Sequence, residues 1–267
     1  MNVAIIGAGP AGLLAAWGAA TSGAEVRIFD PNPAPLPDRI LGLQYLHELC
    51  GLPVEEVRKL ELWYQIIPNN PEGGAFTRPQ LRRAYNFKLG RPLDEVNSTS
   101  HITAGPGHVY SLKDAYTFLH HQFRYDILTR AVTWDEINGE LSKDFDIVIN
   151  TAPLDKLLPQ LVWPTRDAWI QFSLPDDVEV LENTCVYNLD VQVPWYRATN
   201  LDGSVSTEML YPEGQLDVPG RLLRKVVKPD HITGPFRPNV YLAGRWGSWN
   251  PHALTSDAYR VARGACK

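Results

Sequence analysis

The sequence predicts an α/β fold, in which a parallel sheet with helices carries an inserted, mainly antiparallel β region. Three observations predict it. Residues 1–30 follow a strand, turn, helix, strand order. Buried-type apolar strands recur at Asp144–Pro153 and Asn239–Gly244, and each precedes a helical pattern. Between them, about 170–228 break into short strands separated by turn residues, as in a hairpin meander.

The N-terminal turn carries a glycine fingerprint. The apolar run Val3–Ile6 leads into Gly-x-Gly-x-x-Gly and then into an Ala/Leu-rich helix. In this pattern the first glycine allows the tight turn, the second lets the backbone approach a pyrophosphate, and the third lets helix and strand pack closely. The helix N-terminus presents unpaired N–H groups and a partial positive charge to that anion. The candidate cofactor contacts here are Gly7, Gly9, Pro10, Ala11 and Gly12.

The second strand ends in an acid. Asp30 follows Gly12 by 18 residues, where a carboxylate accepts hydrogen bonds from an adenosine ribose and repels a 2′-phosphate. The combination predicts a Rossmann-like domain that binds an adenine dinucleotide. A glycine turn with a purely structural role is the alternative.

The composition is that of an ordinary globular protein. The chain has 267 residues, 44% hydrophobic and 21% charged, with a net charge of −5. No apolar run reaches the ~18 residues that span a bilayer, so we expect no membrane partner. Because Cys50, Cys185 and Cys266 are isolated, we expect neither a disulfide framework nor a metal site. We expect a reducing, cytoplasmic location. The acidic balance disfavours a non-specific grip on nucleic acid but allows a local basic groove.

Several further elements are predicted locally. His120 and His121 point about 100° apart on a helix, so we expect them to be ordinary surface residues. The remaining expectations are an extended loop at Pro31–Pro37, a short helix at Pro53–Leu60, a strand at Leu62–Ile67, a helix at Thr77–Phe87 that stops at Gly90, loop or short strand at 92–108, and a helix at Ala115–Phe123 opened by Ser111–Asp114.

Two later segments narrow the identity of the dinucleotide. The strand before Pro153 ends in small residues, so Ala152 can lie close to the cofactor, and no second glycine fingerprint appears. A separate nicotinamide domain is therefore not expected. The Arg245–Asn250 loop follows Gly244, and Pro251 is predicted to open a helix to Ala265 whose N-terminus points inward. This aromatic loop needs a ring system to face, which makes FAD the predicted cofactor.

One charged pair stands out in the meander. Arg197 and Glu208 lie on strands that flank the turn Asn200–Gly203, so they are expected to pair. Two interpretations stay open. The pair is either a surface salt bridge of little energetic weight or part of a substrate floor where the arginine holds a carboxylate or phosphate.

Three segments together resemble the flavoprotein superfamily of amine oxidases, protoporphyrinogen oxidase and UDP-galactopyranose mutase. They are Val3–Asp30, Asp146–Pro153, and Tyr241–Gly247 with its helix, and they cover roughly half of the chain. The resemblance implies that the last segment lies against FAD. The predicted FAD-binding domain comprises residues 1–60, 110–160 and 228–267, and the predicted substrate region comprises 61–109 and 161–227.

A narrower resemblance is to short, mutase-like FAD-dependent oxidoreductases of bacteriophages. It rests on Gly42–His47, Trp195–Arg197 and Gly244–Trp249. Some such proteins belong to thymidine hypermodification pathways, which implies oxidative cleavage of a glycine attached to the 5-methyl carbon of thymine. The implied partner is a small molecule or a modified nucleobase in DNA, in the host cytoplasm if the chain is phage-encoded.

The candidate site residues rest on placement and resemblance. His47 is a possible acid or base or an ordinary loop histidine, and Lys228 lies near the flavin or is a plain surface lysine. The candidate catalytic residues are His47, Lys228, Arg197 and Tyr196. Beyond the glycine turn and Asp30, the candidate cofactor contacts are Gln44, Ala152, Gly244, Arg245, Trp246 and Trp249.

Three functions remain open at this level. The first is an FAD-dependent oxidoreductase or lyase of amine-oxidase type, whose site needs a cation for a carboxylate and an aromatic cage for an amine. The second is a mutase-like, flavin-dependent sugar isomerase in which Arg197 holds a diphosphate. The third is a flavin-binding module without catalysis.

Overall fold

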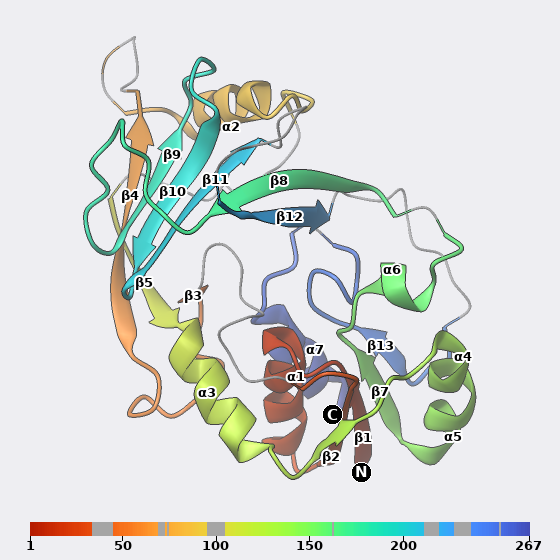
Figure 1. Cartoon of the computed structure of the whole chain (residues 1–267). Helices are drawn as coiled ribbons and strands as arrows, with labels where there is room; N and C mark the ends of the chain where they lie inside the picture. Colours follow the sequence, from red (N-terminus) through yellow and green to blue (C-terminus); the bar gives the residue numbers. More distant parts are fainter. Residues whose placement is uncertain are drawn as a thin grey trace.

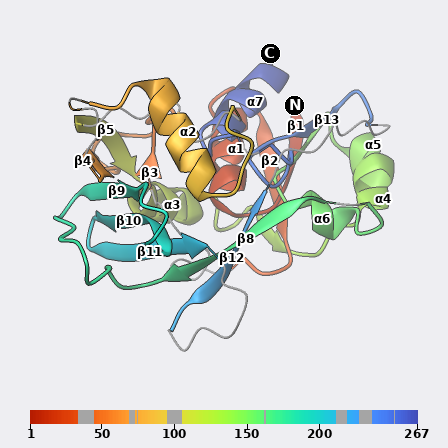
Figure 2. The same cartoon turned by 90° about the horizontal axis from the view of Figure 1, so that it is seen from above.

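Two sheets organise the chain in the computed structural model (Figure 1). The structure describes residues 1–33, 45–68, 73, 75–94, 105–161, 163–210, 219–226, 236–250 and 252–267. Both termini lie in the part of the molecule that holds the parallel, Rossmann-like sheet (Figures 1 and 2), and a separate, mostly antiparallel sheet curls beside it. The predicted fold class is confirmed.

The parallel sheet has five strands in the order β13-β7-β1-β2-β6, and every neighbouring pair is parallel. The sequence analysis missed β6, because three residues are too few for a periodicity to show. The strands are β1 (Asn2–Ile6), β2 (Glu25–Asp30), β6 (Ile127–Thr129), β7 (Ile147–Asn150) and β13 (Val240–Leu242).

Three long helices accompany this sheet: α1 (Pro10–Ala20), α3 (Leu112–Gln122) and α7 (Asp257–Ala265). The helices α1 and α7 lie so close that a Cβ on Gly18 would come within 2.6 Å of the Tyr259 carbonyl oxygen. Pro251, the expected start of the last helix, lies outside the described residues, but α7 begins only at Asp257. Asn250 instead holds a turn, since its side chain accepts from the His252 N–H and its carbonyl accepts from the Ala253 N–H.

The second sheet has eight strands in the order β12-β8-β11-β10-β9-β4-β5-β3. Among these described strands, only the β4–β9 pair is parallel. At the β10–β11 hairpin, Asp202 and Gly203 have φ of 52° and 73°, as the predicted turn requires. The strands are β3 (Tyr45–Leu46), β4 (Lys59–Ile67), β5 (Gly105–Ser111), β8 (Thr165–Gln171), β9 (Thr184–Asn188), β10 (Trp195–Leu201), β11 (Ser204–Leu210) and β12 (Arg221–Val226).

Helix α2 (Arg78–Lys88) covers one face of this sheet. Its N-cap is Thr77, whose side chain and that of Gln80 cap each other's backbone N–H groups, and it ends before Gly90, which has φ of 61°. The helix expected at Pro53–Leu60 is wrong. A turn lies at 54–56, and the last two residues of the expected helix, Lys59 and Leu60, belong to β4 and pair with β5.

Short helices complete the described chain: α4 (Trp134–Glu136), η2 (Ile137–Leu141), α5 (Ser142–Asp144) and α6 (Leu154–Leu157). The predicted helix opened by Ser111 is confirmed as α3, since the Ser111 side chain accepts from the Asp114 N–H. Within the described residues, no helix combines the length and apolar character needed to cross a bilayer.

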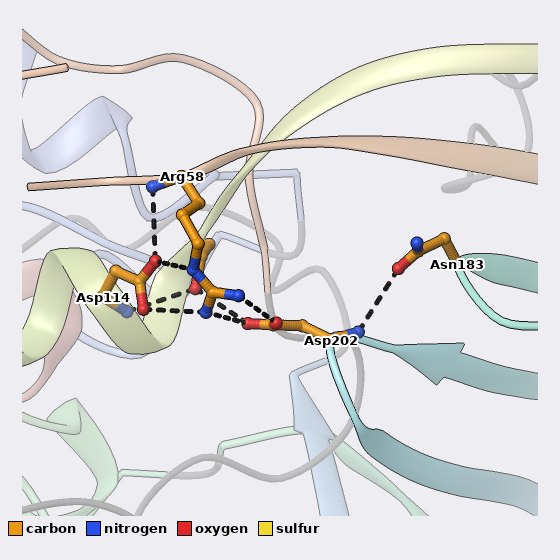
Figure 3. Close-up of polar contacts among 5 residues, drawn as sticks. Arg58, Asp114, Asn183 and Asp202 are labelled. Carbon is orange, nitrogen blue, oxygen red and sulfur yellow. Dashed lines mark hydrogen bonds and ion pairs between the residues drawn. The ribbon is translucent and has the colours of Figure 1, made fainter. Parts of the chain in front are cut away.

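Arg58 ties the two parts of the molecule together (Figure 3). Its guanidinium donates two hydrogen bonds to Asp114 at the start of α3 and two to Asp202 in the β10–β11 turn, at 2.7 to 3.0 Å. Ser111 also donates to Asp202. The arginine therefore joins the antiparallel sheet to a helix of the other part.

Candidate functional site

Three segments that lie far apart in sequence meet at the N-terminus of α1: the glycine turn after β1, the end of β7 and the loop after β13. The Thr151 hydroxyl donates to the Ile6 carbonyl at 2.8 Å. A Cβ on Gly7 would lie 2.9 Å from the same hydroxyl oxygen, and Gly7 has φ of 101°. The first glycine is thus needed both for its backbone conformation and for close approach.

Gly9 and Gly12 differ in what surrounds them. A Cβ on Gly12 would lie 1.8 Å from the Gly7 carbonyl oxygen, so this position holds α1 against β1. A Cβ on Gly9 would meet nothing within 4 Å. Because Gly9 is also the N-cap residue, no side chain caps α1, and open space lies beside a helix end that attracts anions.

Asp30 lies at the end of β2, buried beside this turn. Its carboxylate accepts hydrogen bonds from the Ala8 N–H at 2.7 Å and the Asn32 N–H at 2.8 Å. A carboxylate has about four acceptor sites. The bonds to the turn are therefore compatible with a further bond to a ribose hydroxyl.

One expected surface residue has a structural role beside the same turn. His121 is exposed, but His120 is half-buried and stacks on Tyr116 with ring centroids 5.8 Å apart. Tyr116 in turn donates to the Ala8 carbonyl at 3.2 Å. The expectation that both histidines are surface residues is wrong for His120, because a side chain one helical turn earlier provides a partner.

The loop after β13 lies against the α1 N-terminus. Gly244 has φ of 72°, and a Cβ there would lie 2.8 Å from the Ala11 Cβ. A Cβ on Gly247 would lie 2.6 Å from the carbonyl oxygen of the buried Asn150. The Asn150 amide also bonds to Ala152, through both its oxygen and its nitrogen. Sequence reasoning missed Asn150, although a buried asparagine at the end of a parallel strand is a usable signal.

The tryptophans of this loop pack into a hydrophobic cluster. Trp249 is buried against Trp163 and Trp246, with ring centroids 4.7 and 5.2 Å apart. The cluster also contains Leu154 and Val226, the last residue of β12. It joins the β13 loop to the edge of the eight-stranded sheet.

A β-bulge shapes the inner face of that sheet. Trp195 pairs with Met209 and Arg197 pairs with Glu208, so β10 has one extra residue at this point. The bulge brings two successive side chains onto the face of Glu208. Tyr196 donates to the Glu208 carboxylate at 2.9 Å, and Arg197 forms an ion pair with it. The expected cross-strand pair is confirmed, but with exposed fractions of 13% and 2% it is no surface salt bridge.

Lys225 is a site residue that sequence reasoning missed. It lies on β12, forms an ion pair with Glu208, and sits 5.0 Å above the Tyr196 ring. Its cross-strand neighbour on β8 is Arg166. The sequence of Arg221–Val226 shows no period-2 alternation of charge, and the place of Lys225 depends on pairing with a strand about 55 residues earlier.

Burial and charge perturb these groups in opposite directions. Burial favours a neutral Glu208, but Arg197 and Lys225 outweigh it and hold the pKa of that carboxyl well below its usual range. Burial also opposes the charge on Arg197, whose pKa Glu208 nevertheless raises. Burial lowers the pKa of Lys225 to about 7, despite the nearby carboxylate. The cluster thus contains a fixed anion, a fixed cation and a lysine that titrates near neutrality.

Arg245 connects this face to the β13 loop. Its side chain is exposed, but desolvation by the surrounding protein, followed by the positive charge of Arg197, lowers its guanidinium pKa. Glu208 acts on it in the opposite direction. The positive charge of Arg197 therefore acts on Arg245, although the two residues were predicted from separate motifs.

Tyrosines surround the charged cluster. Tyr85 of α2 contacts the rings of Tyr187 and Tyr196 edge-on, at 5.5 and 6.1 Å. The hydroxyl groups of Tyr45 and Tyr64 are 2.7 Å apart. Burial raises the pKa of all five phenols, so they stay protonated at neutral pH.

The remaining predicted residues are not brought into this cluster. His47 is exposed just after β3 and contacts the ring of Tyr45 edge-on. Gln44 and Lys228 lie outside the described residues. Their expected roles remain predictions, as does the division into FAD-binding and substrate regions.

A family model described as an NAD(P)-binding Rossmann-like domain matches residues 5–35. This match covers the glycine turn, α1 and β2. No curated protein matches the chain.

Solved structures resemble nearly the whole chain. The PF1083 protein from Pyrococcus furiosus is 16% identical with a TM-score of 0.54, over 99% of this chain and 96% of that one. The 2,6-dihydroxypyridine-3-hydroxylase from Arthrobacter nicotinovorans is 12% identical with a TM-score of 0.53, over 99% and 84%. HpxO from Klebsiella pneumoniae, solved with FAD and uric acid, is 13% identical with a TM-score of 0.50, over 100% and 77%. Likeness at these identities shows a shared fold.

Proposed function

We propose that the chain is an FAD-dependent oxidoreductase. The observation that carries the proposal is the meeting of the glycine turn, the end of β7 and the β13 loop at the uncapped N-terminus of α1, with open space at Gly9. The shared fold with a hydroxylase and with a protein solved with FAD supports the same cofactor.

The residues present fit a dinucleotide. The open face of Gly9 and the α1 N-terminus suit a pyrophosphate. Asp30 suits a ribose, and its charge disfavours a 2′-phosphate. Gly244 and Arg245 extend the site toward the charged face of the eight-stranded sheet. When bound, FAD supplies two-electron redox chemistry, and this chain's residues bind and orient the substrate beside it.

The more specific proposal is an oxidase or lyase of amine-oxidase type that acts on a glycine-type adduct of a thymine base. In that reaction the carbon next to nitrogen loses a hydride, the nitrogen loses a proton, and water hydrolyses the imine to glyoxylate and the free amine. Arg197 and Lys225 suit the carboxylate of such a substrate. Lys225, with its pKa near 7, suits the transfer of a proton.

The first experiment identifies the cofactor. We expect the purified protein to be yellow, or to bind added FAD, and to release a chromophore with the absorbance and mass of FAD. A colourless protein that binds no added FAD refutes the proposal.

The second experiment tests the substrate. DNA containing glycine-modified thymidine is added anaerobically, and we expect bleaching of the flavin absorbance and stoichiometric glyoxylate. A matched DNA with unmodified thymidine is the control. If neither DNA bleaches the flavin, the glycine-adduct proposal is contradicted, whereas the FAD-binding proposal is unaffected. Turnover of a nucleotide sugar only after reduction of the protein with dithionite would instead support the sugar isomerase.

A further inference from the structure

The inner face of the eight-stranded sheet carries more positive than negative charge. The charges that act on Lys225 are those of Glu208, Arg197 and Arg166, and Arg245 is coupled to Arg197 and Glu208. Among the described residues, Arg197 and Lys225 contact the Glu208 carboxylate directly, and Arg166 lies opposite Lys225 on β8. Glu208 already accepts bonds from Tyr196, Arg197 and Lys225, so it leaves little acceptor capacity for Arg166.

Several donors on this face lack an acceptor in the part of the chain that the structure describes. The buried Nε and Nη1 atoms of Arg166 and the buried Nε atom of Arg197 have no hydrogen-bond partner within the described residues. Buried donors of charged groups are almost always satisfied in native proteins, because an unsatisfied one costs free energy. Arg166 and Arg197 lie on strands of the same sheet, and the charge of Arg166 acts on both Lys225 and Tyr196. An external acceptor would satisfy these donors and offset the excess charge.

We propose that Arg166, Arg197 and Lys225, positioned by Glu208, form a binding site for a carboxylate or phosphate group of the substrate. Planar guanidinium groups match both anions through paired N–H donors. Tyr85, Tyr187 and Tyr196 border the cluster and are themselves buried, so they exclude water from one side of the site and strengthen its attraction for an anion. The anion site defines the class of substrate, and this part of the proposal rests on the proposed function.

The test is calorimetric titration of the purified full chain, saturated with FAD, using three probes: benzoate, phenyl phosphate and the uncharged benzamide. We expect one or both anions to bind at least tenfold more tightly than benzamide. The tighter of the two anions distinguishes a carboxylate substrate from a phosphate substrate. Added salt is expected to weaken the anions and to leave benzamide unchanged.

The decisive variant is Arg166→Gln, which removes unpartnered donors and is expected to weaken anion binding by about tenfold to a hundredfold. Arg27→Gln on β2 removes the same charge from an exposed site in the other sheet and is expected to have no effect.

The proposal is overturned if benzamide binds as tightly as the anions, if no probe binds, or if Arg166→Gln leaves the affinities unchanged. The comparison of wild-type affinities needs no variant, so a misfolded variant does not remove the test. Failure of the proposed function is recognised separately, as absence of FAD binding with anion binding intact. Failure of this inference appears as an FAD-loaded protein that does not prefer anions.

Discussion

The contrast between Gly9 and Gly12 leads to a quantitative prediction for substitution by alanine. Gly9 has φ of −72° and ψ of 177°, a conformation that alanine adopts without strain, and its Cβ meets nothing within 4 Å. Replacing glycine stabilises by about 0.4–1 kcal/mol through the unfolded state, whereas loss of a favoured N-cap residue costs about 0.5–1 kcal/mol. The two effects nearly cancel, so the apoprotein is expected to unfold as wild type.

FAD binding is expected to respond differently in Gly9→Ala. The added methyl group occupies the open space proposed for the pyrophosphate, and loss of one hydrogen bond to a charged group costs about 1.5–3 kcal/mol, or about ten- to a hundredfold in Kd. At an FAD concentration of 100 times the wild-type Kd, ligand stabilisation is about 2.7 kcal/mol for wild type. For a variant with hundredfold weaker binding it is about 0.4 kcal/mol.

Urea unfolding with and without FAD measures both quantities in one assay. Gly12→Ala is the matched comparison. Its Cβ would lie 1.8 Å from a backbone oxygen, so it is expected to destabilise the apoprotein by about 1–3 kcal/mol. Wild-type FAD affinity in Gly9→Ala, or destabilisation of its apoprotein by about 2 kcal/mol or more, would refute the reasoning.

Three further predictions concern the charged residues. Glu208→Gln leaves Arg197 and Lys225 without their buried partner and is expected to lower the free energy of unfolding by about 3–5 kcal/mol in urea, whereas the exposed Glu61→Gln should change it little. The pKa of Glu208 is depressed in the folded protein, so the stabilisation by its carboxylate is present above the unfolded pKa of the group and declines as the pH falls below that value. When the free energy of unfolding is measured from pH 7 to 3, Glu208→Gln should lack this part of the decline. Identical pH profiles of wild type and Glu208→Gln would contradict the prediction. The ammonium group of Lys88 donates to the carbonyls of Asp190 and Trp195 at 2.6 Å, and burial lowers its pKa to about 8. The free energy of unfolding of the wild type should therefore rise with pH between about pH 8 and 10.5. Lys88→Met should lack this rise when urea unfolding is measured across that range.

The first thirty residues were predictable because their signals are local. An apolar strand, fixed glycine spacing and a terminal acid specify strand, turn and helix without reference to the rest of the chain. The Arg197–Glu208 pair was predictable for the same reason, since the turn at Asp202 and Gly203 sets the register of its hairpin.

The rest of the site depends on contacts distant in sequence. Lys225 joins Glu208 only because β12 pairs with β8 and β8 with β11. The late start of α7 reflects a turn held by the Asn250 side chain. The prediction took Pro251 as a helix start and did not foresee this turn. Burial of the Arg197–Glu208 ion pair could not be predicted either. The pattern of a strand indicates on which face of the sheet a residue lies but not what covers that face.

The number of residues in β10 at the bulge determines which side chains reach Glu208. In a regular strand, Tyr196 and Arg197 would point to opposite faces, and Glu208 would keep only one of them. The extra residue lets one carboxylate bind a phenol, a guanidinium and an ammonium at once. Deleting a single residue at this point would remove one partner while leaving the length of the hairpin turn intact. Insertions and deletions near Trp195 would therefore change which side chains contact Glu208.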